Sequence, residues 1–153
     1  MTSDGKMILI RQERIPVHAA LWEVPSGQID EVVAGIDDPG QSSAPDEIAA
    51  VALRELQEET GYELVEGGEL ISLGDFFTSP GMTDEQVYFF LARPVRQCAG
   101  GHAHHESESI VDCQAFSASE LGRMIDNNEI RNGNTLGICA HLIARGLLSL
   151  DQE

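Results

Sequence analysis

Hydrophobic and polar positions along the chain follow two periods, and these periods predict the secondary structure. Short apolar runs bounded by Gly and Pro predict strands, whereas apolar residues that recur every three to four positions predict helices. The expected strands are residues 6–12, 17–25, 68–81, 85–95 and 110–116. The expected helices are residues 43–62, 117–130 and 132–148.

Each of the two most regular helical segments has an apolar stripe that we expect to pack on a core. The N-terminus of segment 43–62 is marked by Ser43, three residues ahead of Asp46, and its C-terminus by Gly61. We expect Thr135 to open the last helix. The first stripe consists of Ala49, Ala52, Leu53 and Leu56, and the second of Leu136, Cys139, Ala140, Ile143 and Leu147.

Three carboxylates lie on a face next to the first stripe. Glu55 and Glu59 are one turn apart and Glu58 flanks them, while Arg54 precedes Glu58 by four positions and can partly balance their charge. A Glu-rich helix face is often simply solvated. The other interpretation is a site for a hard cation such as Mg²⁺ or Mn²⁺, because clustered carboxylates without soft ligands suit such ions.

The spacing of these residues favours the cation site. Residues 54–61, RELQEETG, resemble the signature helix of the Nudix hydrolases. The resemblance implies an α/β fold, namely an α/β/α sandwich with a mixed, partly parallel β-sheet between helices, formed by residues 1–153 as a single domain. It also implies metal-dependent hydrolysis of a diphosphate linked to another moiety, with Glu55, Glu58 and Glu59 as metal ligands and Arg54 and Gly61 in structural roles.

The opening glycine of the resembling motif is Gly27, in the turn formed by Pro25, Ser26 and Gly27. In the family this glycine offers its backbone carbonyl to the metal. Here it stands too far ahead of the helix for the usual spacing, and a Gly-x5-Asp match at Gly40 and Asp46 fits the turn less well. We therefore expect a loop insertion at residues 31–45, whose Gly, Pro, Ser and Asp content is typical of a loop.

Other stretches resemble the ADP-ribose pyrophosphatase branch of the family. The segment 10–30 includes a Gln-x-Arg unit ending at Arg14, and residues 79–86 include a Ser-Pro-Gly turn. The plain alternatives are an exposed arginine, a core tryptophan at position 22 and an ordinary turn. The residues that the resemblance implies in substrate binding are Arg14, Trp22, Glu23, Pro80, Gly81, Met82 and Glu85.

Residues 97–109 are expected to form a loop that carries the catalytic base. Glu106 and Glu108 match a Glu-x-Glu pair of the resembling branch, in which one carboxylate is the base and the other helps to hold metal. A plain acidic loop is the alternative, in which case Glu85 or Glu58 would be the base. Three nearby histidines suggest a transition-metal site but are more simply solvated loop residues. They are His102, His104 and His105.

Composition limits the partners. A net charge of -17 with a single lysine argues against binding to nucleic acid or to an acidic membrane surface. Three widely spaced cysteines are expected to be free thiols in a reducing cytoplasm. A homodimer is one arrangement that the resemblance implies, although we expect this chain to lack the longer N-terminal segment that helps to build the dimer in the resembling enzymes.

The expected reaction is hydrolysis of ADP-ribose, or a related sugar-linked nucleoside diphosphate, to AMP and a sugar phosphate. Two alternatives stay open from the sequence. One is a Nudix hydrolase of another nucleotide, such as a dinucleotide, a nucleoside triphosphate or a nucleotide sugar. The other is a non-catalytic domain that senses a nucleotide.

Overall fold

The computed structural model describes residues 1–29, 44–99 and 109–150, in which five strands form two antiparallel sheets. The first sheet has the order β2-β1-β5. Its strands are β1 (Met7–Arg14), β2 (Ala19–Glu23) and β5 (Ile110–Phe116). The second sheet is one long hairpin of β3 (Tyr62–Phe77) and β4 (Gln86–Gln97).

The N-terminus connects the two sheets. Thr2 forms an isolated parallel bridge with Val95 of β4, and the Met1 ammonium donates a hydrogen bond to the Ala92 carbonyl at 2.7 Å. A short 3-10 turn (Ile15–Val17), with Pro16 near its start, joins β1 to β2. Parallel pairing within the described residues is confined to this one bridge, so the partly parallel character of the expected sheet is reduced to a single contact.

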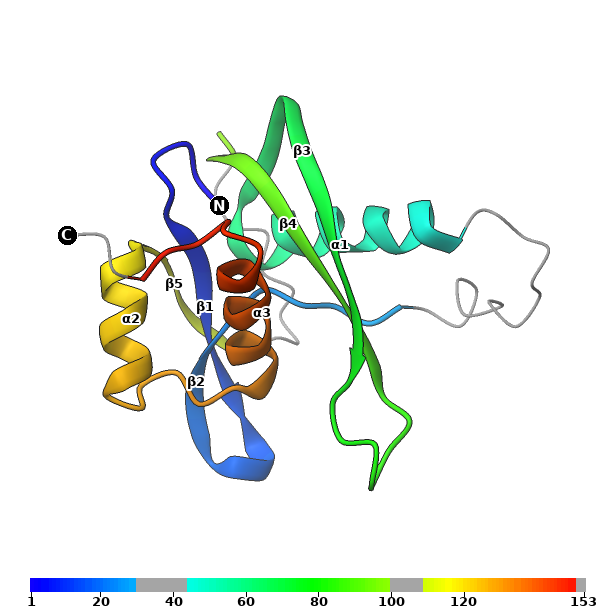
Figure 1. Cartoon of the computed structure of the whole chain (residues 1–153), viewed down its shortest axis with the longest axis vertical. Helices are drawn as coiled ribbons and strands as arrows, with labels where there is room; N and C mark the ends of the chain where they lie inside the picture. The colour runs from blue at the N-terminus through cyan, green and yellow to red at the C-terminus, as the bar shows by residue number, and fades with distance from the viewer. Residues whose placement is uncertain (30–43, 100–108, 151–153) are drawn as a thin grey trace.

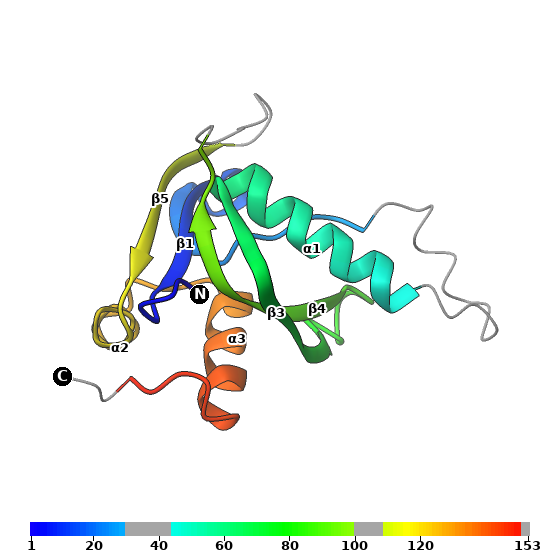
Figure 2. The ribbon, with the colours of Figure 1, turned by 90° about the horizontal axis from the view of Figure 1, so that it is seen from above.

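Three helices cover the sheets. They are α1 (Ala44–Thr60), α2 (Ala118–Asp126) and α3 (Gly133–Ala144). Figures 1 and 2 show α1 on one side of the sheets and α3 on the other. The predicted α/β/α class is therefore confirmed, with the order of its elements. No helix in the described ranges is long and apolar enough to cross a membrane.

The hydrophobic core lies between the sheets and the helices α2 and α3. Alternation along β1 directs Met7 and Leu9 into it, and β4 contributes Phe89 and Leu91 in the same way. Burying side chains of this size stabilises the fold by about 1.5–3 kcal/mol each. The other fully or nearly buried members are Leu73, Leu121, Met124, Ile130, Ile138, Cys139, Leu142 and Leu148.

The buried face of α3 overlaps the predicted one only in part, since Cys139 is buried as predicted. Leu136 is 37% exposed and Ile143 is 43% exposed, whereas Ile138 and Leu142 are buried. The helix is apolar on nearly every side, so the positions of its neighbours, and not the sequence period, decide which stripe faces inward. Its N-cap is Asn132 instead of Thr135, because the Asn132 side chain accepts a hydrogen bond from the Thr135 N–H at 2.9 Å.

The end of α1 matches the prediction. Gly61 has φ of +68°, which a glycine adopts without steric cost, and its N–H donates to the Gln57 carbonyl at 2.9 Å. The predicted cap at Ser43 lies outside the described residues. All three cysteines in the described ranges are free thiols, as expected.

Leu142 lies on the observed buried face of α3 and its neighbour Ile143 on the predicted one, so variants of the two residues distinguish the faces. We expect Leu142→Ala to lower the free energy of unfolding by about 2–5 kcal/mol, because Leu142 is fully buried. Ile143→Ala, the matched control, should change it by no more than about 0.5 kcal/mol. Urea unfolding of both variants measures the difference. Equal losses would mean that the two faces of α3 are buried alike.

Candidate active site

The carboxylates of α1 point inward more completely than its predicted apolar stripe. Glu59 is 1% exposed and Glu55 is 7% exposed, whereas Leu53 and Leu56 are only half-buried. The predicted stripe of alanines and leucines is thus only partly buried, and it is not among the residues that form or contact the main core cluster. The inward face of the helix carries acids, and a buried charge is costly unless a partner compensates for it.

The turn that follows β2 supplies this compensation. The Ser26 N–H donates a hydrogen bond to Glu59 Oε2 at 2.7 Å. Gly27 lies directly against Glu55, since a Cβ placed on Gly27 would be 2.0 Å from the Glu55 carboxyl carbon. A side chain at position 27 would therefore displace the Glu55 carboxylate. The structure thus brings together Gly27, Glu55 and Glu59, three of the four predicted metal ligands.

Helix α3 holds this turn in place from the other side. The Val24 N–H donates to the hydroxyl of Thr135 at 3.0 Å, and that hydroxyl lies 3.0 Å from Asn132 Oδ1. Thr135 is fully buried. Through these two hydrogen bonds the N-terminus of α3 sets the position of Val24. Val24 lies two residues before Ser26, whose N–H donates a hydrogen bond to Glu59.

Glu58, the fourth predicted ligand, lies apart from the inward pair. Arg54 forms ion pairs with Glu58 at 2.8 Å and with Glu55 at 2.6 Å. The predicted charge balance is therefore present. The Glu58 side chain is 29% exposed, so water screens this pair, and we expect it to contribute little to stability.

The donors at this site fit a hard divalent cation. Glu55 and Glu59 carry carboxylate oxygens one helical turn apart, and oxygen donors of this kind are the groups that Mg²⁺ prefers. No group of three or more His, Cys, Asp or Glu residues is already gathered for a metal within the described ranges. The described residues thus offer two buried carboxylates that could hold such an ion, and Glu58, the substrate, water or the rest of the chain could supply further donors.

The predicted phosphate-binding arginine is held by a buried acid. Arg14 donates from Nε to Glu23 Oε1 at 3.0 Å and from Nη2 to Oε2 at 2.7 Å. The Glu23 side chain is 3% exposed and that of Arg14 is 41% exposed. This two-point geometry fixes the plane of the guanidinium and leaves part of it at the surface.

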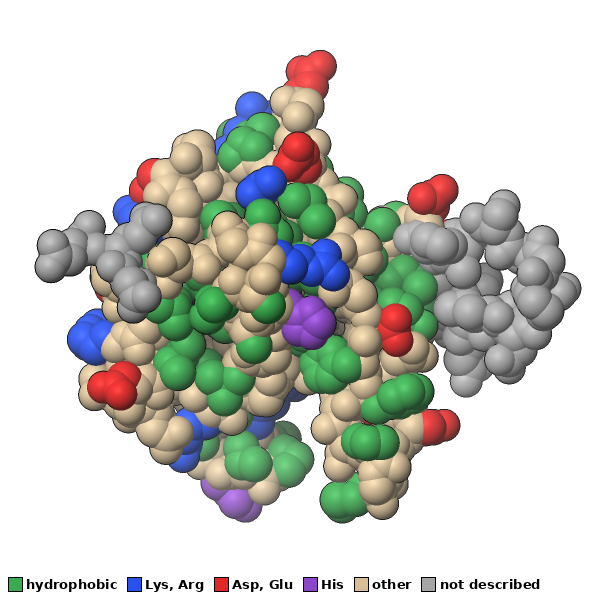
Figure 3. Space-filling view, in the orientation of Figure 1, with side chains coloured by type: hydrophobic (Ala, Val, Ile, Leu, Met, Phe, Trp, Pro, Cys, Tyr) green, Lys and Arg blue, Asp and Glu red, His purple; other side chains and the backbone are tan. Residues whose placement is uncertain are grey.

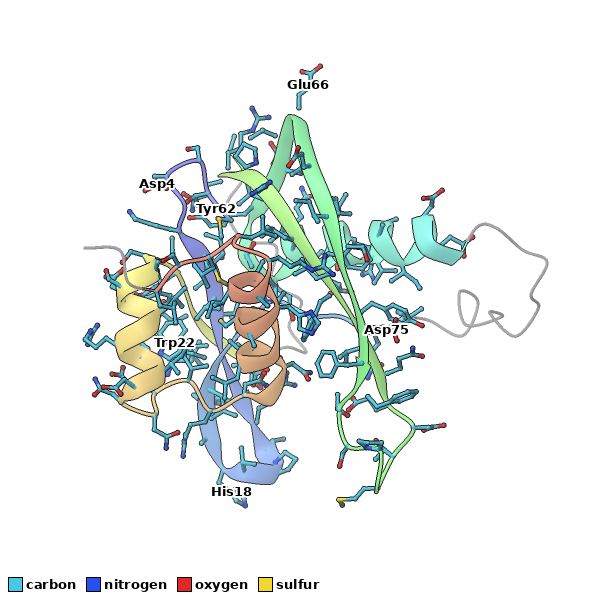
Figure 4. The ribbon with its side chains drawn as sticks, in the orientation of Figure 1. Asp4, His18, Trp22, Tyr62, Glu66 and Asp75 are labelled. Atoms are coloured by element: carbon cyan, nitrogen blue, oxygen red, sulfur yellow. The ribbon has the colours of Figure 1, made fainter. Side chains whose placement is uncertain are left out.

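Trp22 lies on the opposite face of the sheet from its neighbour Glu23. Its ring meets Phe116 edge-on at 5.0 Å between centroids, and the Arg11 guanidinium lies 5.9 Å from its centre. It packs against the core beside α2 (Figure 4). These contacts agree with the alternative of a core aromatic, and a role of Trp22 in substrate binding stays a prediction.

The Ser-Pro-Gly turn lies at the tip of the β3–β4 hairpin. Pro80, Gly81 and Met82 are exposed, Met82 to 86%, and they do not line the cavity that contains Gly27 and Glu55. Figure 3 shows this tip projecting from the lower side, separated by a gap from the β1–β2 tip, where Figure 4 labels His18. The structure therefore does not bring this part of the predicted site to the helix carboxylates.

Glu85, at the base of the same turn, is placed differently. It lines a cavity of about 500 Å³ together with Gly27 and Glu55. The cavity lies between α1 and the β3–β4 hairpin, and the hairpin contributes mainly apolar side chains such as Tyr88 and Phe90. Glu85 is thus a described carboxylate that shares a cavity with the acidic face of α1.

Several predicted residues lie outside the described ranges. They are Glu106 and Glu108, the histidines 102, 104 and 105, and most of the expected insertion at residues 31–45.

Two residues of this region have no role in the sequence-based prediction. Cys113 of β5 points its thiol at the Thr60 carbonyl, 3.9 Å away, and burial raises its pKa to about 11, with the charges of Asp112 and Glu59 adding to the effect. Gln12 has a buried side-chain oxygen, Oε1, with no hydrogen-bond partner among the described residues. A polar residue at an inward position of an apolar strand is the signal that could have identified Gln12.

Comparisons with known proteins bear on the family to which the chain belongs. The NUDIX domain profile matches residues 1–136. An ADP-ribose pyrophosphatase of Bacillus subtilis is 28% identical over 135 residues, which cover 88% of this chain and 64% of the relative. A GDP-mannose pyrophosphatase of Pectobacterium atrosepticum is 32% identical over 147 residues, covering 94% of this chain and 69% of the relative.

A solved structure supports the fold. The crystal structure of an ADP compounds hydrolase superposes with a TM-score of 0.66 at 17% identity, covering 95% of this chain and 70% of that one. At this identity the likeness concerns the fold alone. The chain thus spans 64% of the length of the Bacillus subtilis relative, and 69% of that of the GDP-mannose pyrophosphatase.

The link from α3 to the turn after β2 can be tested at Thr135. We expect Thr135→Val to lower the free energy of unfolding by about 1–3 kcal/mol, because the change keeps the shape but leaves the Val24 N–H without its acceptor. Thr135→Ser keeps the hydroxyl and should restore much of that loss. Urea unfolding of the two variants gives the comparison. If valine is as stable as threonine, the hydroxyl does not anchor the turn.

Proposed function

The chain belongs to the NUDIX domain family, and on that premise we propose that it is a metal-dependent hydrolase of sugar-linked nucleoside diphosphates, with ADP-ribose as the first substrate to test. The observation that carries the proposal is the inward pair Glu55 and Glu59, held under the turn at Ser26 and Gly27. A solvated acidic face would leave both carboxylates in water. Here both are buried on a face turned toward the protein.

In the proposed reaction, water attacks one phosphorus of the diphosphate, the bridging P–O bond breaks, and AMP and a sugar phosphate leave. A bound Mg²⁺ or Mn²⁺ ion would neutralise the diphosphate oxygens and lower the pKa of water. Glu55, Glu59 and the Gly27 carbonyl would hold the ion, and Glu58 would join them by exchanging its contact with Arg54.

The remaining roles belong to residues around this centre. Arg14, oriented by Glu23, would bind a phosphate or ribose hydroxyl with the exposed part of its guanidinium. Glu106 or Glu108 would take the proton from the attacking water, and Glu85, which shares the cavity of Glu55, is the described alternative. Pro80, Gly81 and Met82 would reach the substrate only from the hairpin tip.

A nucleotide sugar with a different base is the second candidate substrate. The relatives include both ADP-ribose and GDP-mannose pyrophosphatases at similar identity, so the proposed chemistry is shared, and both the base and the sugar are open choices. A non-catalytic sensor has less support, because all three glutamates of the signature helix are present.

We also propose the broader setting of this activity. Residues 1–153 would form one domain with an inserted loop at 31–45, acting in the cytoplasm on a small-molecule substrate. The free thiols support a reducing compartment. A homodimer would match the arrangement implied by the ADP-ribose pyrophosphatase branch.

Release of AMP tests the proposed function. The purified chain is incubated with ADP-ribose or GDP-mannose at saturating Mg²⁺, and nucleoside monophosphate is quantified with and without a chelator. We expect Mg²⁺-dependent release of AMP from ADP-ribose. Release of GMP alone would assign the other base, and no release from either compound would contradict the proposal.

Glu59 and Glu58 should respond differently to neutralisation. We expect Glu59→Gln to lower kcat by at least about 10²-fold, because Glu59 is buried at the proposed metal site, while the fold survives. Glu58→Gln should also lower kcat but by less, since Glu58 stands outward with Arg54. The control is Glu47→Gln in the first turn of α1, which should keep wild-type kinetics. Near-native kcat in Glu59→Gln would refute the metal-site assignment.

Arg14 has two functions that a pair of variants can separate. Arg14→Ala should raise KM for ADP-ribose more than it lowers kcat, since a phosphate contact away from the attacked bond mainly supplies uniform binding. It should also lower Tm, because Glu23 is left buried and unpaired. Combining it with Glu23→Gln should restore Tm but not KM. An unchanged KM would make the ion pair purely structural.

A further inference from the structure

The amide oxygen of Gln12 is an acceptor that the described protein does not use. Gln12 Oε1 is buried, and no donor among the described residues reaches it. The great majority of buried polar side-chain atoms have a hydrogen-bond partner. An unused acceptor lowers stability, so such an atom is expected where a ligand completes the hydrogen bond.

Strand pairing places Gln12 on the face of the sheet that the acidic end of α1 covers. Ile10 is paired with Glu23 of β2 and with Cys113 of β5, and the Cys113 thiol faces the carbonyl of Thr60 at the end of α1. Residues directly opposite on antiparallel strands, and residues two apart on one strand, share a face. Gln12 follows Ile10 by two residues on the continuous β1–β2 ladder.

Along β1 Gln12 lies between Arg14 and Ile10, and Ile10 is paired with Cys113, which contacts the end of α1. Arg14 is two residues beyond Gln12, and its side chain reaches back to Glu23 in the row of Ile10. Gln12 and Leu21 are paired between these two positions, so the Arg14 side chain crosses the sheet beside them to reach Glu23. A ligand held by the α1 carboxylates and by Arg14 would pass over Gln12.

We propose that Gln12 is a binding residue whose amide oxygen accepts a hydrogen bond from an O–H group of the bound substrate complex. This rests on the proposed function. In the proposed complex Arg14 binds an anionic group and the α1 carboxylates bind a cation. Neither the anionic group nor the cation requires the neutral amide oxygen of Gln12 as an acceptor. A hydroxyl does. Two sources share this chemistry: a sugar hydroxyl of the substrate, and a water held by the metal ion.

The variant Gln12→Met tests the proposal, because methionine keeps a similar volume and removes the acceptor. Its control is Gln114→Met, an exposed glutamine on the neighbouring strand β5. The full chain is assayed for Tm without ligand, for kcat and KM with ADP-ribose at saturating Mg²⁺, and for the Mg²⁺ concentration that gives half the maximal rate.

We expect opposite effects on stability and binding. Removing an unused buried acceptor should raise the Tm of Gln12→Met by about 2–4 °C, while KM or the Mg²⁺ requirement rises about tenfold. The control should change none of these. A merely structural glutamine would give the reverse, a lower Tm with unchanged KM and Mg²⁺ requirement, and that result would overturn the proposal.

A second substrate separates the two hydroxyl sources. The methyl ester of ADP keeps the diphosphate but has no terminal sugar. If the sugar hydroxyl is the donor, Gln12→Met and wild type should have the same KM for this ester. If water on the metal is the donor, the defect should persist and the Mg²⁺ requirement should rise. A KM and an Mg²⁺ requirement equal to wild type on both substrates would overturn the assignment.

Failure of the proposed function gives a different pattern. In that case the wild-type chain releases no nucleoside monophosphate from ADP-ribose or GDP-mannose. Gln12 is then judged from Tm with the same two variants: a rise in Gln12→Met alone supports an acceptor kept for a ligand, and a fall overturns it.

Discussion

The contact between a short turn and two buried carboxylates is the constraint on which the rest of the site depends. Glu55 and Glu59 are withdrawn from water on the inner face of α1, and the backbone at Ser26 and Gly27 is the group that meets them. Burying charge is costly unless it is hydrogen-bonded or paired. The turn must therefore approach the helix closely, and a side chain at position 27 would displace the Glu55 carboxylate.

Several separate elements serve that contact. Strand β2 delivers the turn, and Thr135 of α3 anchors it through the Val24 N–H, although the two residues are 111 positions apart in the sequence. Gly61 ends α1 right after the acids and redirects the chain into β3. The same β2 segment carries Glu23, so the position of Arg14 and that of the turn depend on one strand.

The site also shows a conflict between stability and binding. The buried acids on α1 and the amide oxygen of Gln12, which has no partner among the described residues, each carry a desolvation cost in the free protein. A ligand that binds only the folded state stabilises it and so offsets that cost. Such features are expected where a protein is selected for what it binds, and both lie on the face between α1 and the β2-β1-β5 sheet.

The sequence by itself determined the elements and their chemical type. Periodicity and turn residues predicted β1, β5 and α1, and the spacing of Arg54, Glu55, Glu58 and Glu59 identified the family, because both signals are local along the chain. Tertiary structure decided which side of each helix is buried. On α3, apolar residues occur all round, so packing selected Ile138 and Leu142 over Leu136 and Ile143. The burial of Glu59, the pairing of Arg14 with Glu23 and the unused oxygen of Gln12 likewise arise from neighbours distant in sequence, which no local pattern encodes.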